Sequence, residues 1–190
     1  MGRIPHDPNG GSCNDVRHGG EEVDPAHGWP FDLSHLSATA PFVAVVTAVS
    51  QRAWWHKPVD GEPSSSYGVV PMTTTNFRVE QQVRGTLPAT VQIDEKGARQ
   101  DKSFPCWQWA YQVLNDPLPE VGHQYVLFAQ SWLGGARYEA LWRSADRFEV
   151  VSGTVHSLLD FFPEANLTFS MQPEQLAKFI ADVQRQPSPT

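Results

Sequence analysis

Apolar and polar residues follow one another in short runs that predict β-strands along most of the chain. Residues 41–49 are apolar almost throughout, rich in β-branched side chains and free of glycine, which predicts a central strand buried on both faces. Residues 73–80 and 90–93 alternate apolar and polar side chains, a pattern typical of half-solvated strands. Turn-forming residues at 84–88 separate these two segments and others follow at 95–97, so we expect an antiparallel hairpin.

Three further short strands are predicted in the second half of the chain. Residues 124–129 form a second strongly apolar segment, and a Gly-Gly pair then precedes a return strand at 138–142. The segment 147–151 ends at a Ser-Gly turn. Because turns recur at short spacing with no helix between them, we expect a mainly β fold, a small antiparallel barrel or sandwich over residues 41–151.

One amphipathic helix is predicted near the C-terminus, at residues 172–186. Its apolar residues recur at helical spacing and are Leu176, Phe179, Ile180 and Val183. Pro173 suits a first helical turn, which Gln172 or Ser170 would cap. We expect the apolar stripe to pack against the β-rich unit, the alternative being a helix that binds a partner. Residues 155–162 fit either a strand or a short second helix.

The composition of residues 1–40 sets them apart from the rest of the chain. They contain six glycines and four prolines, with six acidic and two basic residues. Such a segment buries too little apolar surface to offset the entropy of ordering it, so we expect a flexible N-terminal arm that is disordered over residues 1–28. Residues 41–186 then form one domain, and residues 187–190 a short tail. Four apolar residues are placed to pin the end of the arm to the domain: Trp29, Phe31, Leu33 and Leu36.

Length and charge exclude several classes of protein. The chain has 190 residues and a formal net charge of −7, which argues against nucleic-acid binding because that requires a basic surface. Its longest apolar runs are much shorter than the roughly 18 residues of a membrane span. Its 2 cysteines are too few for a disulfide-stapled scaffold. We therefore expect a single domain without a membrane span and without nucleic-acid partners.

No motif for catalysis, a cofactor or a metal ion stands out in the sequence. It contains no phosphate-binding glycine loop, no nucleophile-elbow motif and no pair of histidines at metal-binding spacing. The acidic residues on the expected strands fall at outward positions, which favours a solvated face over paired catalytic carboxylates. These residues are Glu80, Asp94, Glu139 and Glu149. We therefore expect no cofactor, no metal ion and a non-catalytic protein, with a hydrolase of unassigned substrate or a structural assembly protein as alternatives.

Two segments that follow the first strand carry a recognisable order of residues. The first is Phe77-x-Val79-Glu80-x-x-Val83-Arg84-Gly85-x-Leu87-Pro88-x-x-Val91-x-Ile93, and the second is Pro117-Leu118-x-x-Val121-Gly122-x-x-Tyr125-Val126-Leu127-Phe128. This order resembles the netrin-like modules, a family that includes netrin C-terminal domains, tissue inhibitors of metalloproteinases and a bacterial branch. The resemblance implies a five-stranded OB-type barrel with helices at its side. It also implies a non-catalytic module that binds a protein or envelope ligand.

The resemblance bears on the two cysteines and on the location of the protein. The family often ties its N-terminal segment to a point after the third strand, which implies a disulfide between Cys13 and Cys106 in an exported, secreted or envelope-associated protein. The alternative is an exposed Cys13 and a buried Cys106. No basic region followed by an apolar stretch comes after Met1, a start that by itself predicts a cytoplasmic protein. The family's protease inhibitors use a free N-terminal cysteine, a mechanism we do not expect here because Cys13 lies inside the chain.

The tryptophans suggest where a ligand would bind. Trp54 and Trp55 end the first predicted strand, next to a long loop at 56–71 that is rich in glycine, proline and serine. In an extended chain their side chains point to opposite faces, so at least one is expected outside the barrel interior. We predict that Trp54 and Trp55 contribute to a ligand-binding surface, such as an aromatic platform for a sugar ring, a peptide or another flat ligand. The alternative is that both rings pack beneath the loop.

Overall fold

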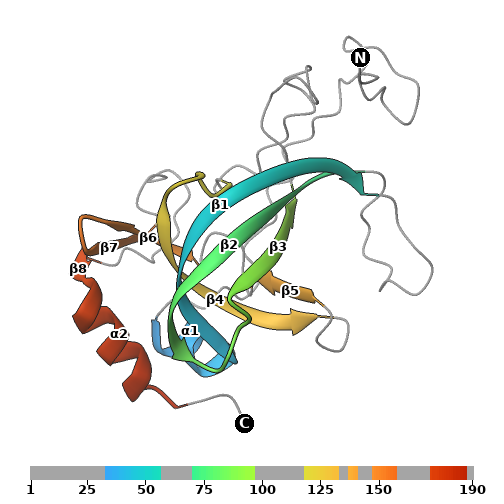
Figure 1. Ribbon diagram of the computed structural model, residues 1–190. Coiled ribbons are helices and arrows are strands. Elements are labelled where there is room, and N and C mark those ends of the chain that lie inside the picture. Colours follow the sequence, from blue (N-terminus) through green and yellow to red (C-terminus); the bar gives the residue numbers. More distant parts are fainter. Residues whose placement is uncertain are drawn as a thin grey trace, which may run out of the picture.

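A computed structural model describes residues 33–56, 70–96, 118–132, 137–140, 147–157 and 172–187. Within these ranges the protein is mainly β, with one eight-stranded sheet and two helices (Figure 1). The elements are α1 Leu33–Thr39, β1 Phe42–His56, β2 Val70–Arg84, β3 Thr90–Lys96, β4 Gln124–Trp132, β5 Arg137–Ala140, β6 Arg147–Val151, β7 Thr154–Ser157, β8 Glu174–Gln175 and α2 Leu176–Arg185. The mainly β fold and the C-terminal helix are therefore confirmed.

The long strand β1 organises the sheet because it has partners along both edges. It pairs with β2 over nearly its whole length and with β4 over Phe42–Thr47. The order of neighbours is β1-β2-β3-β5-β4-β6-β7-β8. Almost all pairings are antiparallel as predicted, but β3 and β5 run parallel and meet at one registered pair, Ile93 with Tyr138. This parallel pair corrects the expectation of a purely antiparallel sheet.

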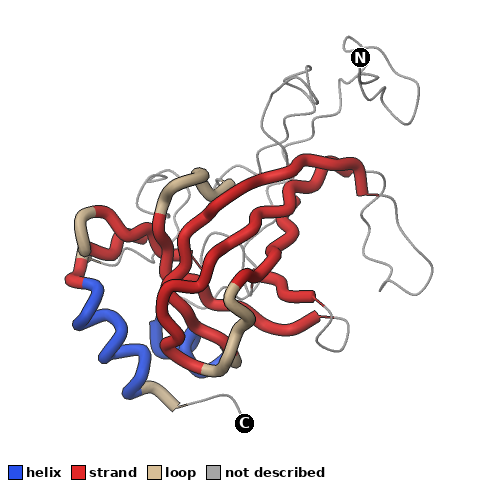
Figure 2. Tube along the Cα trace, in the orientation of Figure 1, coloured by secondary structure: helices blue, strands red, loops and turns tan. Residues whose placement is uncertain are grey.

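Each face of β1 carries its own buried cluster, which confirms the prediction of a central strand buried on both faces. The helix-side core consists of Leu36, Ala40, Val43, Val45, Val126, Phe128, Phe148, Val155, Phe179, Ile180 and Val183. The strand core consists of Ala44, Val46, Ala48, Phe77, Leu87, Val91, Ile93, Tyr125, Leu127 and Ala129. Figure 2 shows both helices at the lower left of the sheet, while the β1–β2 pair curves away toward the upper right.

The predicted hairpin of residues 73–80 and 90–93 is present as β2 and β3. Both strands are longer than expected, and β3 continues through Glu95 and Lys96, which the sequence had suggested as a turn. Gly85 begins the connection with a φ of 64°, in the left-handed region that glycine adopts most easily. A Cβ atom at this position would lie 2.5 Å from the carbonyl oxygen of Pro41. Gly85 is therefore required both for its conformation and for its small size.

A residue other than glycine in the left-handed conformation costs about 1–2 kcal/mol. Gly85→Ala should lower the free energy of unfolding by more than this amount. The excess arises because the new methyl group collides with the backbone of Pro41. Gly153→Ala is the matched control, since Gly153 has a φ of 77° but open space around its Cβ position. Urea denaturation of both variants measures the difference, and equal losses would contradict the steric argument.

The C-terminal half of the sheet contains the predicted short strands. β4 and β5 pair antiparallel as expected, and the residues between them lie outside the described ranges. β6 and β7 form a two-residue hairpin in which Ser152 and Gly153 both have positive φ, of 50° and 77°. Of the ambiguous segment 155–162, residues up to Ser157 belong to the strand β7, and the rest lie outside the described ranges.

The start of the C-terminal helix corrects the sequence prediction. α2 begins at Leu176 rather than near Pro173, and its N-cap is Gln175, which makes no side-chain capping bond. Gln172 therefore does not cap the helix, and Ser170 lies outside the described ranges. The reason is a long-range one: Glu174 and Gln175 pair with β7, so their backbone belongs to the sheet. The predicted apolar stripe is confirmed, because its members contribute to the helix-side core or pack against it.

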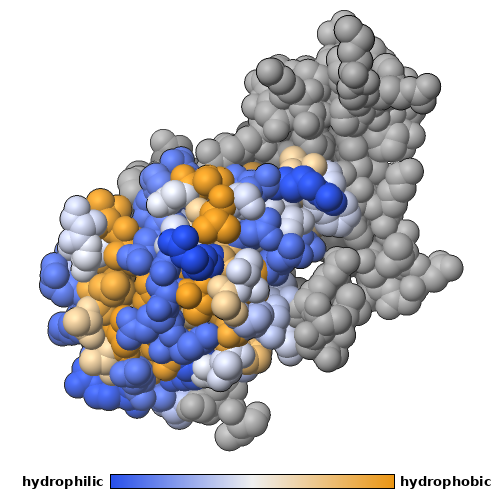
Figure 3. Space-filling view, viewed as in Figure 1, coloured by the Kyte–Doolittle hydropathy of each residue, from blue (hydrophilic) through white to orange (hydrophobic). Residues whose placement is uncertain are grey.

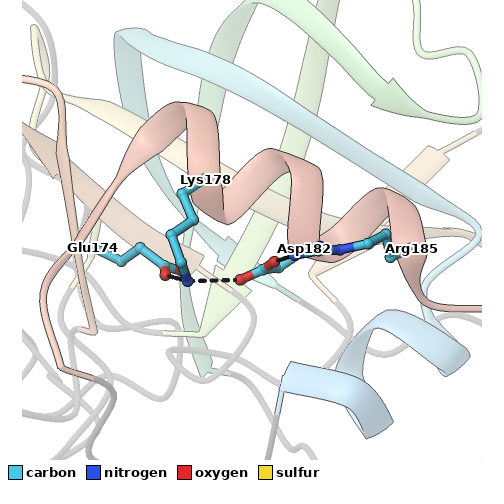
Figure 4. A network of polar contacts seen from close by, with 4 residues as sticks. All are labelled: Glu174, Lys178, Asp182 and Arg185. Carbon is cyan, nitrogen blue, oxygen red and sulfur yellow. Dashed lines mark hydrogen bonds and ion pairs between the residues drawn. The ribbon is translucent and has the colours of Figure 1, made fainter.

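The outward face of α2 carries a chain of ion pairs (Figure 4). Lys178 lies between Glu174 and Asp182, and Arg185 also contacts Asp182. The side chains of Lys178 and Arg185 are 64% and 72% exposed. Exposed pairs of this kind contribute little to stability, typically about 0–1 kcal/mol each. The position of α2 is therefore determined mainly by its buried face.

Arg84, at the end of β2, connects both helices to the sheet. Its guanidinium donates hydrogen bonds to the carbonyl oxygens of Ser37 in α1, of Val183 in α2, at 2.7 Å, and of Gln186, at 3.0 Å. Carbonyl groups near the end of a helix lack partners within the helix, and an arginine is well suited to bind them. One side chain therefore connects the helix at the start of the described chain with the helix at its end.

Candidate functional site

One side of β1 is buried near the start of the strand and more exposed toward its end. Near its start, Val43 and Val45 are buried in the helix-side core. Further along, Ser50, Arg52 and Trp54 point outward where neither helix contributes to a buried cluster. The polar outward side continues onto β2 and β3. We call this surface the β1–β3 face; its residues are Ser50, Arg52, Trp54, Met72, Thr74, Asn76, Arg78, Glu80, Thr90, Gln92 and Asp94.

A first row of hydrogen bonds crosses the three strands of the β1–β3 face. The indole nitrogen Nε1 of Trp54 donates to the hydroxyl oxygen of Thr74, at 2.9 Å. The Thr74 hydroxyl in turn donates to Asp94 Oδ1, at 2.5 Å. The indole thus reaches from β1 to β2 and is held against the sheet by its only polar atom. Trp54 is half-buried in this arrangement.

A second row lies two residues away on β2 and β3 and four residues away on β1. Gln92 Nε2 donates to Asn76 Oδ1, at 2.8 Å, and Asn76 Nδ2 donates to the hydroxyl oxygen of Ser50, at 2.9 Å. The strand register explains this arrangement, because Asn76 pairs with both Ser50 and Gln92. Paired residues in neighbouring strands project to the same face, so three short polar side chains meet there.

The charged residues of the β1–β3 face balance one another. Arg52 and Arg78 are positive, and Glu80 and Asp94 are negative. Glu80 accepts hydrogen bonds from Arg78 Nε, at 2.9 Å, and from the Thr47 hydroxyl, at 2.8 Å. These contacts, that with Arg78 above all, hold the pKa of Glu80 below its usual range. The face therefore carries no excess of either sign. In Figure 3, hydrophilic side chains (blue) spread over β1 and β2 toward the upper right.

A second polar cluster lies inside the protein rather than on its surface. Arg147, at the start of β6, donates a hydrogen bond to Glu95 Oε1, near the end of β3, and the two side chains are 0% and 5% exposed. The guanidinium carbon of Arg147 also lies 5.9 Å from the centre of the Tyr125 ring, within the range of a cation–π contact. The pair joins β3 to β6 close to the point where β3 and β5 share their one registered pair.

The environment of Glu95 affects its ionisation. Burial raises the pKa of the Glu95 carboxyl group, and the neighbouring Arg147 opposes this effect. Its second oxygen, Oε2, is buried and has no hydrogen-bond partner among the described residues. The cluster is thus a structural connection between strands in which, among the described residues, the carboxylate of Glu95 is only partly satisfied.

The raised pKa of Glu95 predicts a specific pH dependence of stability. Between the ordinary glutamate value of 4.5 and the raised folded value, the folded protein binds the proton more tightly than the unfolded chain does. This contribution to stability is therefore present at low pH and lost as pH rises through that window. Glu95→Gln should remove the effect, so the wild-type curve of unfolding free energy against pH should fall more steeply there than the variant's. Parallel curves would contradict the prediction.

The structure describes only part of the predicted site. Trp54 lies on the β1–β3 face. The backbone of Trp55 follows in β1 and pairs with Pro71. The side chain of Trp55 lies outside the described part of the chain. The predicted Cys13–Cys106 disulfide also lies outside the described ranges. Sequence reasoning did not identify the partners of Trp54, because short polar residues on a solvated strand carry no motif. The alternating polar residues of β1, β2 and β3 are the signal in the sequence. They identify the partners of Trp54 only when the register of the three strands is known.

Two negative findings apply to the described residues only. None of their helices is long and apolar enough to cross a membrane. They also contain no group of three or more histidine, cysteine, aspartate and glutamate side chains that could hold a metal ion. In comparisons with known proteins, no family model matches the chain and no curated protein matches its sequence.

Proposed function

We propose that the protein is a non-catalytic binding module with an OB-type barrel, which binds its ligand on the β1–β3 face. The strand pairings support the barrel. Neighbours run from β1 through β2, β3, β5 and β4, and β4 pairs with β1 again. This circuit of five strands is compatible with a small Greek-key barrel of the OB type, from which β6, β7 and β8 extend.

The observation that carries the proposed function is the double row of hydrogen-bonded polar side chains across β1, β2 and β3. OB-type barrels bind their ligands over the second and third strands and beside the loop that joins the first strand to the second. Here β2 and β3 supply Thr74, Asn76, Gln92 and Asp94, and Trp54 lies just before the residues that connect β1 to β2. The rows therefore coincide with the surface that this type of barrel uses.

The netrin-like resemblance extends the proposal to the class of partner. That family combines an OB-type barrel with helices packed at its side, and the helix-side core beneath α1 and α2 is compatible with it. On this basis we propose an exported protein whose partner is a protein or an envelope component.

A capture experiment tests the proposed function. The full-length protein is immobilised and exposed to an envelope extract of its source cells, and the bound material is compared with that retained by Asn76→Ala/Gln92→Ala. A ligand of the β1–β3 face should be retained by the wild type and lost by this double variant. Lys178→Ala, in α2 and therefore outside the β1–β3 face, is the control and should retain the ligand. A ligand that binds all three proteins equally would contradict the proposal.

A further inference from the structure

We propose that the ligand of the β1–β3 face is a neutral oligosaccharide, an inference that rests on the proposed function. Four properties of the face support this ligand: its charge, its apolar content, its hydrogen-bonding groups and its dimensions. Each of these distinguishes a sugar chain from the other ligands that a small β-domain binds.

The charge balance of the face argues against an anionic polymer. Such ligands are bound by arginine and lysine side chains whose charge is not neutralised by neighbours. On this face Arg78 already binds Glu80, and Arg52 lies in the same strand register as Asp94, with Thr74 between them. The net charge of the whole chain, −7, also disfavours attraction of a polyanion.

The apolar content of the face argues against a large protein interface. Such interfaces have a core of aromatic and aliphatic residues that are buried on binding. The exposed large hydrophobic residues of the described chain are Val49, Val121 and Val151, and none belongs to the two rows. Trp54 and Met72 are the apolar members of the face, and both are half-buried. One aromatic ring among polar side chains suits a ligand that alternates flat apolar surface with hydroxyl groups.

The hydrogen-bonding groups of the second row complement sugar hydroxyls. Each hydroxyl can donate and accept, so it needs neighbours of both kinds. Asn76 uses one N–H and its carbonyl oxygen within the row, and Gln92 uses one N–H. Among the described residues, a second N–H on each amide and the carbonyl oxygen of Gln92 have no further hydrogen bond, so they can bind a ligand. Because the side chains already hold one another in place, ordering them on binding costs little entropy.

The dimensions of the face fit several linked rings better than one. On β2 and β3 the two rows are two residues apart, which corresponds to about 6.6–6.8 Å, and on β1 their members Trp54 and Ser50 are four residues apart. The three strands span about 9.4–9.8 Å. This area is larger than a single pyranose ring. We therefore expect an oligosaccharide to bind across the strands, with one ring near Trp54 and the next over Asn76 and Gln92.

Titration of the full-length, ¹⁵N-labelled protein with defined sugars tests the inference. The probes are cellohexaose, chitohexaose and maltohexaose, with a heparin hexasaccharide as the anionic comparison. At least one neutral hexasaccharide should shift backbone amide signals of β1, β2 and β3, and the heparin fragment should not. Asn76→Ala/Gln92→Ala should weaken binding about tenfold or more, because it removes hydrogen bonds to the ligand. Lys178→Ala should bind with unchanged affinity.

The outcomes separate this inference from the proposed function. If no neutral hexasaccharide binds at millimolar concentration, the oligosaccharide is excluded, and the capture experiment still decides whether the face binds another class of ligand. A second outcome is that a hexasaccharide binds but shifts signals only outside β1, β2 and β3, with the same affinity for the wild type and the double variant. In that case the assignment of this face fails. Circular dichroism of the double variant shows whether it remains folded, and Thr74→Val, which disconnects Trp54 from Asp94, gives an independent measure of the first row.

Discussion

Arg147→Met alone should lower the free energy of unfolding by about 3–5 kcal/mol, the usual effect of breaking a buried ion pair. The substitution removes the partner of Glu95 Oε1, while Glu95 stays 5% exposed and its other oxygen already lacks a hydrogen bond among the described residues. The remaining carboxylate must then be buried without compensation or bind a proton. Chemical denaturation at neutral pH measures the loss. Part of it should be recovered at lower pH, where protonation neutralises Glu95.

The double variant Arg147→Met/Glu95→Leu tests the origin of that loss. If the cost comes from an uncompensated charge, replacing both residues with apolar ones of similar size should restore stability to the wild-type level or above it, since such replacements are often neutral or stabilising by about 1–4 kcal/mol. A double variant as unstable as Arg147→Met would show instead that the shape of the pair, not its charge, matters most.

Phe179→Ala should destabilise the protein by about 3–5 kcal/mol. Phe179 is fully buried, and its ring centre lies 5.1 Å from that of Phe148 and 6.4 Å from that of Phe128. Truncation leaves a cavity between α2 and the sheet and removes the aromatic contacts of the helix with Phe128 and Phe148. We therefore expect faster amide hydrogen exchange throughout α2, together with a lower melting temperature.

The neighbouring residue provides the control for Phe179→Ala. Lys178 lies on the same helix but is 64% exposed, so Lys178→Ala should change stability by no more than about 0.5 kcal/mol even though it breaks the ion pairs of Figure 4. Equal effects of the two substitutions would mean that the exposed ion pairs, rather than the buried face, hold α2 on the sheet.

Elements with a strong local pattern were predictable from the sequence. Residues 42–46 are apolar and mostly β-branched, a pattern typical of a strand with a core on each face. The spacing of Phe179, Ile180 and Val183 likewise indicated the buried face of α2. In both cases the information lies within a few neighbouring residues, so it can be obtained without knowing the tertiary structure.

Features that depend on distant residues were not predictable. Glu95 lies in a segment that suggested a turn, and nothing near it in the sequence indicates that Arg147 lies beside it in the folded protein. The late start of α2 has the same cause, because Glu174 and Gln175 pair with β7. Likewise, Ser50, Asn76 and Gln92 form a row only through the register of three strands.

The composition of the helix-side core has a consequence for folding during synthesis. Val43 and Val45 leave the ribosome well before Phe179 and Val183, which belong to the same core. Domains begin to fold while the chain is still being synthesised, and synthesis adds about 5–20 residues per second. The apolar side of β1 therefore stays uncovered by α2 until all the residues between β1 and α2 have been synthesised. In this interval the nascent chain exposes a surface that molecular chaperones bind, and a message truncated before α2 yields a product prone to aggregate.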